Sequence, residues 1–317
     1  MKKKFDFFMT DMCNSNCPYC FVDTKENIDE AHFMSKAQIA EYTKSVCEDS
    51  EVTIFGGEPS FAPEACSFLV SELQKRNVSD ITLYSNGRDI NFLREMKECG
   101  VSVAVNLDAY LSNSDKLSDI SDFRWNFTIS PSNMRHLSFV YRMFIEYDKK
   151  IDIKIERYYK RGAVFWNEES LKTFDAHLKN LYDDYVENIV KRHANYMPYV
   201  LKNSLIRMIA LVSGNEMPRD CSNKTMFFPD RTKQMCYSCK SSESISDDCK
   251  ACSLGSVCDF TKTCFSHYPE HIRKSLCSLE DILFRRATHV MHDMKENSTF
   301  QRAVLSMCEN NFYGKII

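Results

Sequence analysis

The sequence lacks any long apolar run. Its most apolar stretch, 205–212, contains Arg207 and is far shorter than the roughly 20 residues that a membrane-spanning helix needs. It also lacks an excess of one charge: 41 Lys and Arg stand against 44 Asp and Glu, which favours neither nucleic acid nor an anionic membrane as a partner. The basic start at 2–4 is followed by Asp6 and Asp11 rather than by the apolar core of a signal peptide. We therefore expect a cytoplasmic protein with no nucleic-acid and no membrane partner.

Cysteine is absent from residues 100–220, yet the whole chain of 317 residues contains 15 of them. Three lie within 13–20 and eight within 221–277, so two cysteine-rich sites flank a cysteine-free middle. The odd number speaks against a fully paired disulfide framework. In a reducing cytoplasm, closely spaced thiols are more often metal ligands than disulfides. The isolated cysteines at 47, 66, 99 and 308 are expected to be ordinary buried side chains.

Short apolar runs alternate with helical patterns through the first half of the chain. The expected strands are Phe5–Thr10, Val52–Phe55, Ile81–Tyr84, Val101–Asn106, Phe127–Ile129 and Ile151–Ile155. The expected helices are one capped by Ser35, then Pro63–Arg76, Asp89–Cys99 ending at Gly100, and Asn133–Lys149, while 110–123 is too polar for a confident helix. This alternation predicts an α/β fold with a parallel sheet closed into a full or partial barrel. In such a barrel, functional residues follow the strands.

The rest of the chain divides by composition. Residues 167–216 read as a helical connecting segment, whose apolar stripe we interpret as core packing. Residues 217–277 are polar and cysteine-rich, so we expect this part to depend on metal for its fold. A final helical segment, 278–317, begins with a capping pattern at Ser278. With the barrel at 1–166, these make four expected regions.

The first cysteine site has the spacing C-x3-C-x2-C directly after the first expected strand. Its ligands are Cys13, Cys17 and Cys20. Three thiolates in one short loop can hold three irons of a cubane cluster and leave the fourth iron open. A structural zinc ion needs four protein ligands, so the zinc alternative requires another ligand such as His32.

The motif resembles the signature of the radical S-adenosylmethionine (radical SAM) enzymes, C-x3-C-x-aromatic-C, with Tyr19 at the aromatic position. Three further segments resemble motifs of that family, each after the next expected strand: Gly56-Gly57-Glu58-Pro59, Ser85-Asn86-Gly87 and Asn106-Leu107-Asp108. Asn106 stands where the family usually has serine. The resemblance implies a partial (β/α)6 TIM-like barrel that binds a [4Fe-4S] cluster and S-adenosylmethionine.

The resemblance also implies which residues bind the cofactor. The methionine amino group would be held by the backbone and acid of Gly56, Gly57, Glu58 and Pro59, whose glycines permit a close approach. Contacts to adenosine or ribose are expected from Ser85, Asn86, Asp108 and Ser130. The catalytic acid or base is not assigned, although Asp11, Asp108 and Glu156 follow strands and are candidate proton acceptors.

The second cysteine site contains eight thiols, enough for two sets of four. Its members are Cys221, Cys236, Cys239, Cys249, Cys252, Cys258, Cys264 and Cys277. Spacing alone leaves both zinc and iron–sulfur clusters open. The segment resembles the SPASM extension of radical SAM enzymes, including a Pro229-Asp230 pair before Cys236, but Arg231 replaces the usual glycine.

That second resemblance implies two auxiliary [4Fe-4S] clusters. One would use Cys249, Cys252, Cys258 and Cys277. The other would use Cys221, Cys236, Cys264 and Cys239, although five residues rather than three separate Cys258 from Cys264. A fully occupied set of four cysteines favours a role in electron transfer.

Radical SAM enzymes with a SPASM extension mostly modify peptides or proteins. We therefore predict an enzyme of ribosomal peptide maturation that forms thioether or carbon–carbon cross-links. Formylglycine formation in sulfatases is an alternative, for which the chain is short, and so is a reaction on a small molecule. A non-catalytic, zinc-stabilised binding protein is the alternative from a different class.

The expected partners are a peptide or protein substrate and an electron donor such as flavodoxin or ferredoxin. Only four residues precede the first expected strand, Phe5–Thr10, so we expect no N-terminal peptide-recognition domain. A leader peptide would then be bound by the barrel, by the extension or by a separate protein.

Overall fold

The structure is a computed structural model. It describes residues 2–111, 114–147, 151–156, 159, 164–192, 199–212, 224–234, 268–296, 298 and 301–302. The chain forms two compact units: residues 1–127 with 219–239, and residues 128–218 with 240–317. Within the described ranges, none of the helices has the length and apolar character needed to cross a membrane. The four functional regions expected from composition stay a prediction.

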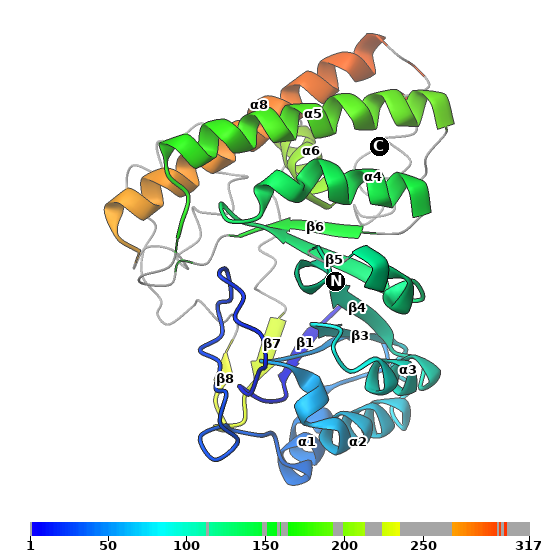
Figure 1. Ribbon diagram of the computed structural model, residues 1–317. Coiled ribbons are helices and arrows are strands. Elements are labelled where there is room, and N and C mark those ends of the chain that lie inside the picture. Colours follow the sequence, from blue (N-terminus) through cyan, green and yellow to red (C-terminus); the bar gives the residue numbers. More distant parts are fainter. Residues whose placement is uncertain are drawn as a thin grey trace. The chain divides into compact units, whose positions relative to one another are not determined.

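The first unit is built on a mainly parallel sheet (Figure 1). Its strands are β1 (Lys4–Phe8), β2 (Glu51–Phe55), β3 (Asp80–Ser85), β4 (Ser102–Asn106), β5 (Arg124–Ile129), β7 (Lys224–Phe227) and β8 (Lys233–Gln234). They lie in the order β5-β4-β3-β2-β1-β7-β8. All neighbours pair in parallel except β7 and β8, which pair antiparallel. This arrangement is consistent with the expected partial barrel.

Three helices connect the first four strands, and each has a local reason to form where it does. They are α1 (Lys36–Tyr42), α2 (Pro63–Gln74) and α3 (Ile90–Glu98). Ser35 and Gln38 form a reciprocal capping box at the start of α1. The Asp89 side chain accepts the amide of Phe92 at the start of α3. Gly100 follows α3 with φ +82°, which confirms the expected helix end.

Three expected elements have different bounds. The first strand ends at Phe8 rather than Thr10, because Thr10 forms an isolated antiparallel bridge with Phe33. Among the described residues of 110–123, the chain forms the short 3₁₀ helix Ser114–Ile120 and no α-helix, in line with the polarity of this stretch. The helix expected over 133–149 is a 3₁₀ turn, Met134–His136, followed by α4 (Leu137–Tyr147).

The segment 224–234 belongs to the sheet, although it lies in the polar region 217–277, where the sequence predicted no strand. β7 pairs with β1 from Lys4 to Phe7. Phe227 is 1% exposed, and its ring stacks on Tyr42 at 4.5 Å between centroids. Three successive apolar residues, 226–228, are all buried. The prediction missed this strand because a four-residue element within a polar region has too little periodicity to stand out.

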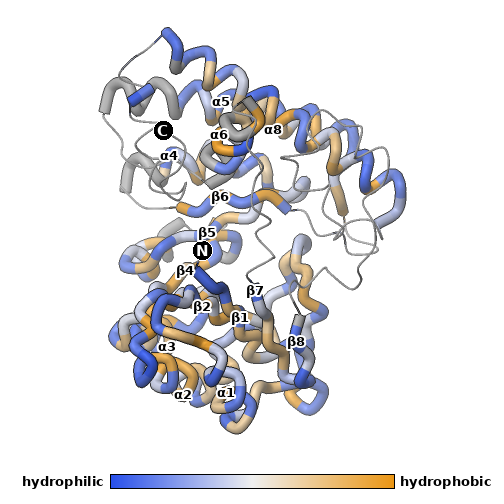
Figure 2. Tube along the Cα trace, turned by 180° about the vertical axis from the view of Figure 1, so that it is seen from behind, coloured by the Kyte–Doolittle hydropathy of each residue, from blue (hydrophilic) through white to orange (hydrophobic). Residues whose placement is uncertain are grey.

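The second unit is mainly helical. It contains α4, β6 (Ile151–Ile155), α5 (Glu168–Arg192), α6 (Tyr199–Val212) and α8 (Glu270–Glu296). Apolar residues recur along α5 and α8 at helical spacing (Figure 2). Where their side chains are described, these residues are buried, and the two helices pack against each other. A buried ion pair joins Arg207 on α6 to Glu280 on α8, and the Arg207 guanidinium lies 4.8 Å from the centre of the Phe284 ring. Because both charges are almost fully buried, removing one partner would be costly.

The last helix begins earlier than expected. The prediction placed its start at Ser278, but α8 starts at Glu270, directly after Pro269. The carbonyl of Pro269 accepts the amides of Ile272 and Arg273, which closes the first turn. The buried side chains of Ile272 and Leu276 belong to the same apolar stripe as the later turns, so burial extends the helix toward its N-terminus.

Phe227→Ala tests the contribution of β7 to the core. Loss of a buried aromatic ring that stacks on Tyr42 and packs against Phe7 should lower the free energy of unfolding by about 3–5 kcal/mol. Urea denaturation followed by circular dichroism measures this change. Phe227→Leu, which keeps most of the volume, should cost clearly less. Equal and small losses for both variants would show that β7 is not part of the folded core.

Candidate functional site

The cysteine motif lies in a long loop, residues 9–34, between β1 and α1. The two ends of this loop hold one another: the Met34 amide donates to the Met9 carbonyl over 2.9 Å, and Thr10 pairs with Phe33. Farther along, the Cys13 amide donates to the Lys25 carbonyl over 2.9 Å. The loop therefore begins from a closed base, and its three cysteines follow that base.

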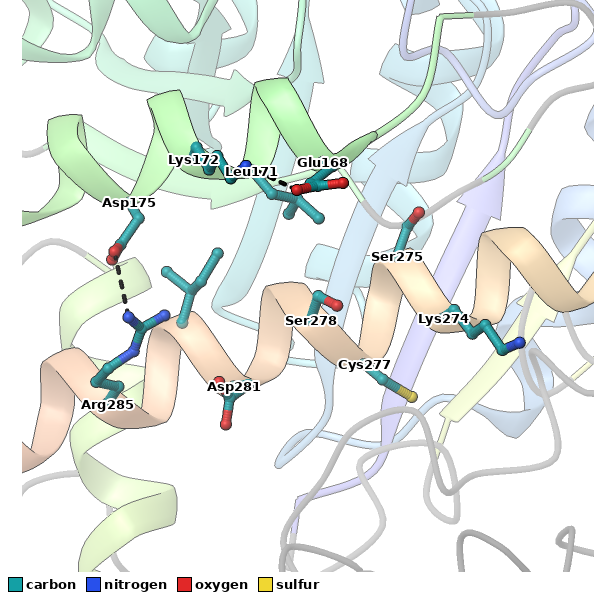
Figure 3. A pocket seen from close by; sticks show the side chains of 11 residues that line it. Glu168, Leu171, Lys172, Asp175, Lys274, Ser275, Cys277, Ser278, Asp281 and Arg285 are labelled. Atoms are coloured by element: carbon teal, nitrogen blue, oxygen red, sulfur yellow. Dashed lines mark hydrogen bonds and ion pairs between the residues drawn. The ribbon is translucent and has the colours of Figure 1, made fainter.

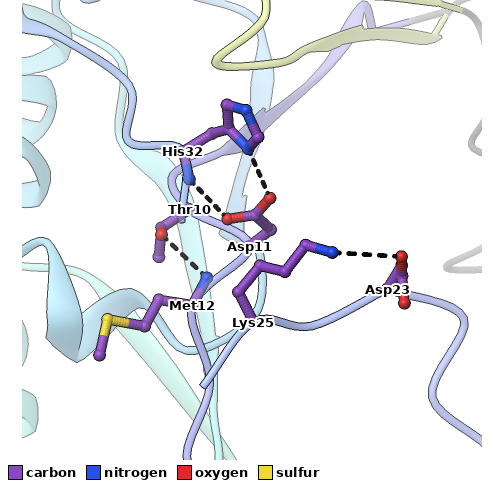
Figure 4. A network of polar contacts seen from close by, with 6 residues as sticks. All are labelled: Thr10, Asp11, Met12, Asp23, Lys25 and His32. Carbon is purple, nitrogen blue, oxygen red and sulfur yellow. Dashed lines mark hydrogen bonds and ion pairs between the residues drawn. The ribbon is translucent and has the colours of Figure 1, made fainter. Parts of the chain in front are cut away.

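Asp11 closes the base with its side chain (Figure 4). One carboxylate oxygen accepts the His32 backbone amide over 2.7 Å, and the other lies 2.8 Å from His32 Nδ1. The zinc alternative needs a fourth ligand such as His32, whereas in this structure the His32 imidazole is paired with Asp11. Asp11, a candidate proton acceptor, likewise has a local structural role.

The three thiols differ in their exposure to solvent. Cys13 is buried, while Cys17 and Cys20 are partly exposed, and a turn joins the Cys20 amide to the Cys17 carbonyl over 3.0 Å. Burial, followed by the negative charges of Cys20 and Asp108, raises the pKa of the Cys17 thiol to about 12. Thiolates in such a loop need a cationic partner, and an iron cluster supplies one.

The donor set fits a cluster with one open iron. Within the part of the chain that the structure describes, no three His, Cys, Asp or Glu side chains converge on the position of a single metal ion. A cubane cluster does not require its ligands to converge on one position, because each thiolate binds a different iron. Cys13, Cys17 and Cys20 would hold three of the irons.

The glycine pair after β2 lies against the base of the loop. The Gly57 amide donates to the Thr10 carbonyl over 2.6 Å, and the Glu58 amide donates to the Met12 carbonyl over 2.7 Å. A Cβ added to Gly56 would come within 2.4 Å of the Thr10 carbonyl oxygen, and one added to Gly57 within 2.3 Å of that of Met12. The sequence argument gave these glycines a role in the close approach of cofactor. In the structure, the space of the missing Cβ atoms is taken by the loop backbone.

Glu58 joins the ends of β2 and β3. Its carboxylate is 1% exposed and accepts hydrogen bonds from Ser85 Oγ at 2.9 Å, the Asn86 amide at 2.7 Å and the Ser60 amide at 3.1 Å. Burial raises the pKa of Glu58, and these hydrogen bonds act in the opposite direction. Pro59 follows as the buried first residue of the 3₁₀ turn Pro59–Phe61. The expected cofactor contact of Glu58 stays a prediction.

Asn86 connects the end of β3 to the cysteine loop. Its Nδ2 donates to Asn14 Oδ1 over 2.8 Å and lies 3.1 Å from Ser15 Oγ. Both partners lie between Cys13 and Cys17. Ser85 uses its hydroxyl to accept the Gly87 amide as well as to donate to Glu58. Both residues, expected at adenosine or ribose, hold neighbouring protein segments in this structure.

Tyr19 connects the loop to the end of β4. Its hydroxyl donates to the Asp108 carboxylate and accepts from Asn106 Nδ2 over 2.8 Å. The Asn106 side-chain carbonyl in turn accepts the Asp108 amide over 3.0 Å. Burial and the charge of Asp108 raise the pKa of Tyr19, so the phenol stays protonated. Sequence reasoning recorded Asn106 as a departure from the family pattern without assigning it a role.

The loop also packs on β7. Phe8, Val22, Met226 and Phe228 form a buried apolar cluster, against which Cys20, Phe21 and Phe55 pack. The end of the cysteine loop is therefore supported by a segment about 200 residues later in the chain. Nothing in the spacing of the motif indicated this support.

Two further candidates, Ser130 and Glu156, lie in the second unit. Ser130 is buried, and its hydroxyl lies 2.7 Å from that of Ser132. Glu156 follows β6 and is 3% exposed, with its amide donating to the Ile129 carbonyl over 2.8 Å. No described residue donates a hydrogen bond to its Oε2 atom. Burial alone raises the pKa of Glu156 to about 8.

The auxiliary cysteines lie mostly outside the described residues. These are Cys221, Cys236, Cys239, Cys249, Cys252, Cys258 and Cys264. Cys277 is described: it is exposed on α8 and lines a groove between α5 and α8, together with Lys274 and Ser278 (Figure 3). Its expected ligation of a cluster stays a prediction.

The isolated cysteines differ from their expectation. Cys66 is buried in α2 as predicted, but Cys47 and Cys99 are exposed, because both follow the last turn of a helix. Cys308 lies outside the described residues.

Residues 7–125 match the family model of the radical SAM superfamily. The chain contains a radical SAM domain, which indicates that it is an enzyme. The matched segment contains the three loop cysteines and the Gly-Gly, Asn86 and Asp108 segments described above. None of the curated proteins matches this sequence.

The radical SAM enzyme is also similar in fold to solved structures. A structure of anSMEcpe with bound AdoMet superposes with a TM-score of 0.65 at 15% identity, covering 96% of this chain and 98% of that one. Native anSMEcpe with bound AdoMet and Kp18Cys peptide gives a TM-score of 0.64 at 15% identity, over 92% and 99% of the two chains. At this identity the likeness concerns the fold, and it supports the expected α/β barrel class.

Gly57→Ala tests the contact between the glycine pair and the loop. The added Cβ cannot fit 2.3 Å from the Met12 carbonyl, so the loop base must move and the iron content after reconstitution should fall at least severalfold. Gly100→Ala is the matched control. Unlike Gly57, Gly100 has a positive φ, +82°, but no atom lies within 4 Å of its added Cβ, so Gly100→Ala should lower stability without lowering iron content. Equal iron content in all three proteins would contradict the contact.

Glu156→Gln tests the buried carboxyl through its pH dependence. The pKa of Glu156 is about 8 in the folded protein and ordinarily 4.5, so the folded state binds more protons than the unfolded state between these two pH values. Stability from this group is therefore present at low pH and is lost as the pH rises toward 8. The melting temperature of the Gln variant should therefore rise relative to that of the wild type when the pH is raised from 5 to 8. A difference independent of pH would refute the raised pKa.

Proposed function

We propose that this radical SAM enzyme modifies a side chain of a peptide or protein, as in ribosomal peptide maturation by thioether or carbon–carbon cross-linking. The observation that carries the proposal is the combination of the matched radical SAM segment with eight later cysteines in a SPASM-like pattern. The likeness to anSMEcpe in complex with a peptide supports it at the level of fold. The non-catalytic zinc alternative is wrong for this chain, because residues 7–125 match an enzyme superfamily.

In this proposal, Cys13, Cys17 and Cys20 bind a [4Fe-4S] cluster whose open iron binds S-adenosylmethionine. When bound, this pair supplies a 5′-deoxyadenosyl radical that removes a hydrogen atom from the substrate. The protein contributes the rigid loop: the backbone of Gly57 and Glu58 holds its base, and Asn86 holds its first turn. A rigid site keeps the reacting atoms together and excludes water.

The contacts to S-adenosylmethionine remain as proposed from the family motifs. They are Tyr19, Gly56, Gly57, Glu58, Pro59, Ser85, Asn86, Asp108 and Ser130. The polar side chains among them already hold protein partners in the structure. Their contribution to binding is therefore expected to combine direct contact with the positioning of neighbouring groups.

Two auxiliary [4Fe-4S] clusters belong to the proposal. One uses Cys249, Cys252, Cys258 and Cys277, and the other uses Cys221, Cys236, Cys264 and Cys239. Cys277 is exposed on α8, where a thiol is available to a metal centre. An electron donor such as flavodoxin or ferredoxin, a separate leader-peptide-binding protein and a cytoplasmic location complete the proposed setting.

Formylglycine formation is the second candidate function. The chain was expected to be short for a sulfatase-maturing enzyme, but it covers 98% of the length of anSMEcpe, a sulfatase maturase. Length therefore does not separate the two functions. The substrate has to be identified by experiment.

The cofactor chemistry can be tested without a peptide. Anaerobically reconstituted wild-type protein should contain about twelve irons, and a Cys13/Cys17/Cys20→Ala variant about eight, if there is one radical cluster and two auxiliary clusters. The wild type should release 5′-deoxyadenosine from S-adenosylmethionine after reduction with dithionite, and the variant should not. About four irons in the wild type would refute the auxiliary clusters alone.

The substrate class can be tested by mass spectrometry. Kp18Cys peptide and peptides encoded by short reading frames beside the gene are incubated with enzyme, S-adenosylmethionine and dithionite. A cross-link mass in a neighbouring peptide supports ribosomal peptide maturation, and formylglycine in Kp18Cys supports the second candidate. The triple alanine variant controls for chemical oxidation. Release of deoxyadenosine that no peptide stimulates, with no peptide modified, would favour a small-molecule substrate instead.

A further inference from the structure

Asn106 has two roles at the end of β4 that a serine could not combine. Its side-chain carbonyl accepts the Asp108 amide over 3.0 Å, which stabilises the turn that follows the strand. Its amide nitrogen donates to the Tyr19 hydroxyl over 2.8 Å. A serine hydroxyl can accept the Asp108 amide, but it is a single atom close to the backbone. The departure from the family pattern therefore adds a contact to the cysteine loop.

Asp108 completes the contact from the same turn. The Tyr19 hydroxyl donates to its carboxylate while accepting from Asn106, so both hydrogen-bonding directions of the phenol are used. A phenol bonded to a carboxylate makes a charge-assisted hydrogen bond, which is stronger than one between neutral groups. Tyr19 is the residue directly before Cys20, so this contact restrains a cluster ligand.

The Asp108 carboxylate also places a negative charge beside the loop. It is bonded to Tyr19, which lies between the expected ligands Cys17 and Cys20 in the sequence, so the charge is fixed close to the thiols of the loop. The reduction potential of an iron–sulfur cluster depends on nearby charge and on hydrogen bonding around its sulfurs. A fixed negative charge makes addition of an electron to the cluster less favourable.

We propose that Asn106 and Asp108 are positioning residues of the radical cluster, which act through Tyr19 to restrain the cysteine loop and to keep the reduction potential of the cluster low. This assigns the turn after β4 to the cluster, whereas the family motif assigned Asp108 to the nucleoside. The inference rests on the radical SAM chemistry and not on the peptide substrate, so failure of the peptide assays leaves its test unaffected.

Three conservative variants separate charge from geometry. Asp108→Asn keeps an oxygen that can accept from Tyr19 but removes the charge. Asn106→Ser keeps an acceptor for the Asp108 amide but loses the amide that reaches Tyr19, and Tyr19→Phe keeps the ring but loses the hydroxyl. A double variant, Tyr19→Phe with Asn106→Ser, tests whether the two residues act together.

The full chain is reconstituted anaerobically, and three quantities are measured. Asp108→Asn should shift the midpoint potential of the radical cluster to a less negative value. The potential is measured by a redox titration monitored with electron paramagnetic resonance. Tyr19→Phe and Asn106→Ser should each release iron to a chelator severalfold faster than the wild type. The double variant should release it no faster than the more affected single variant. Asn106 is not among the proposed contacts to S-adenosylmethionine, so the affinity of Asn106→Ser for S-adenosylmethionine, measured by equilibrium dialysis, should change by less than about threefold, well below the tenfold that 1.4 kcal/mol represents.

Each measurement can also overturn the proposal. An unchanged potential in Asp108→Asn would mean that the charge of Asp108 does not lower the reduction potential of the cluster. Additive iron release in the double variant would mean that Asn106 does not act through Tyr19. Thermal unfolding of the cluster-free proteins identifies a general loss of stability: if the variants unfold earlier in proportion to their iron release, the role is structural and the proposal is wrong.

Discussion

The backbone contact between the end of β2 and the start of the cysteine loop is the constraint on which the site depends. The amides of Gly57 and Glu58 donate to the carbonyls of Thr10 and Met12, and no Cβ fits between the segments. Parallel pairing of β1 and β2 brings the two strand ends together, and the glycines let the chains continue in contact beyond the sheet. Cys13 follows directly after this contact, so its position is determined by main-chain hydrogen bonds rather than by flexible side chains.

From this base, the loop is held by polar side chains at the ends of successive strands. Asn86 after β3 reaches Asn14 and Ser15, and the turn after β4 reaches Tyr19. Glu58 links the first two of these strand ends through Ser85 and the Asn86 amide. Several residues that the family motifs associate with the cofactor therefore also organise one another. Polar networks of this kind are rigid when all members are paired, which suits a loop that must present three thiolates to one cluster.

The strand β7 links the two cysteine-rich parts of the sequence. It pairs with β1, and Met226 and Phe228 belong to the apolar cluster against which Cys20 packs. Residue Arg231 follows with φ +67°, a conformation that favours glycine, which explains why glycine is usual at this position of the SPASM pattern. The segment expected to begin an independent metal-dependent region thus starts by completing the core of the first unit. Folding of the cysteine loop is in this way coupled to a late part of the chain.

The sequence by itself determined the alternation of strands and helices, the spacing of the candidate cluster ligands Cys13, Cys17 and Cys20, and the motifs at four strand ends. These features are local: hydrophobic periodicity, capping residues such as Ser35 and ligand spacing all act within a few residues. Only the tertiary structure decided that the glycine pair contacts the loop, that Asn106 and Asp108 hold Tyr19, and that β7 pairs with β1. These contacts join residues that are roughly 45 to 220 positions apart, and no local pattern encodes them, because they arise when strands pair and bring their ends to one edge of the sheet.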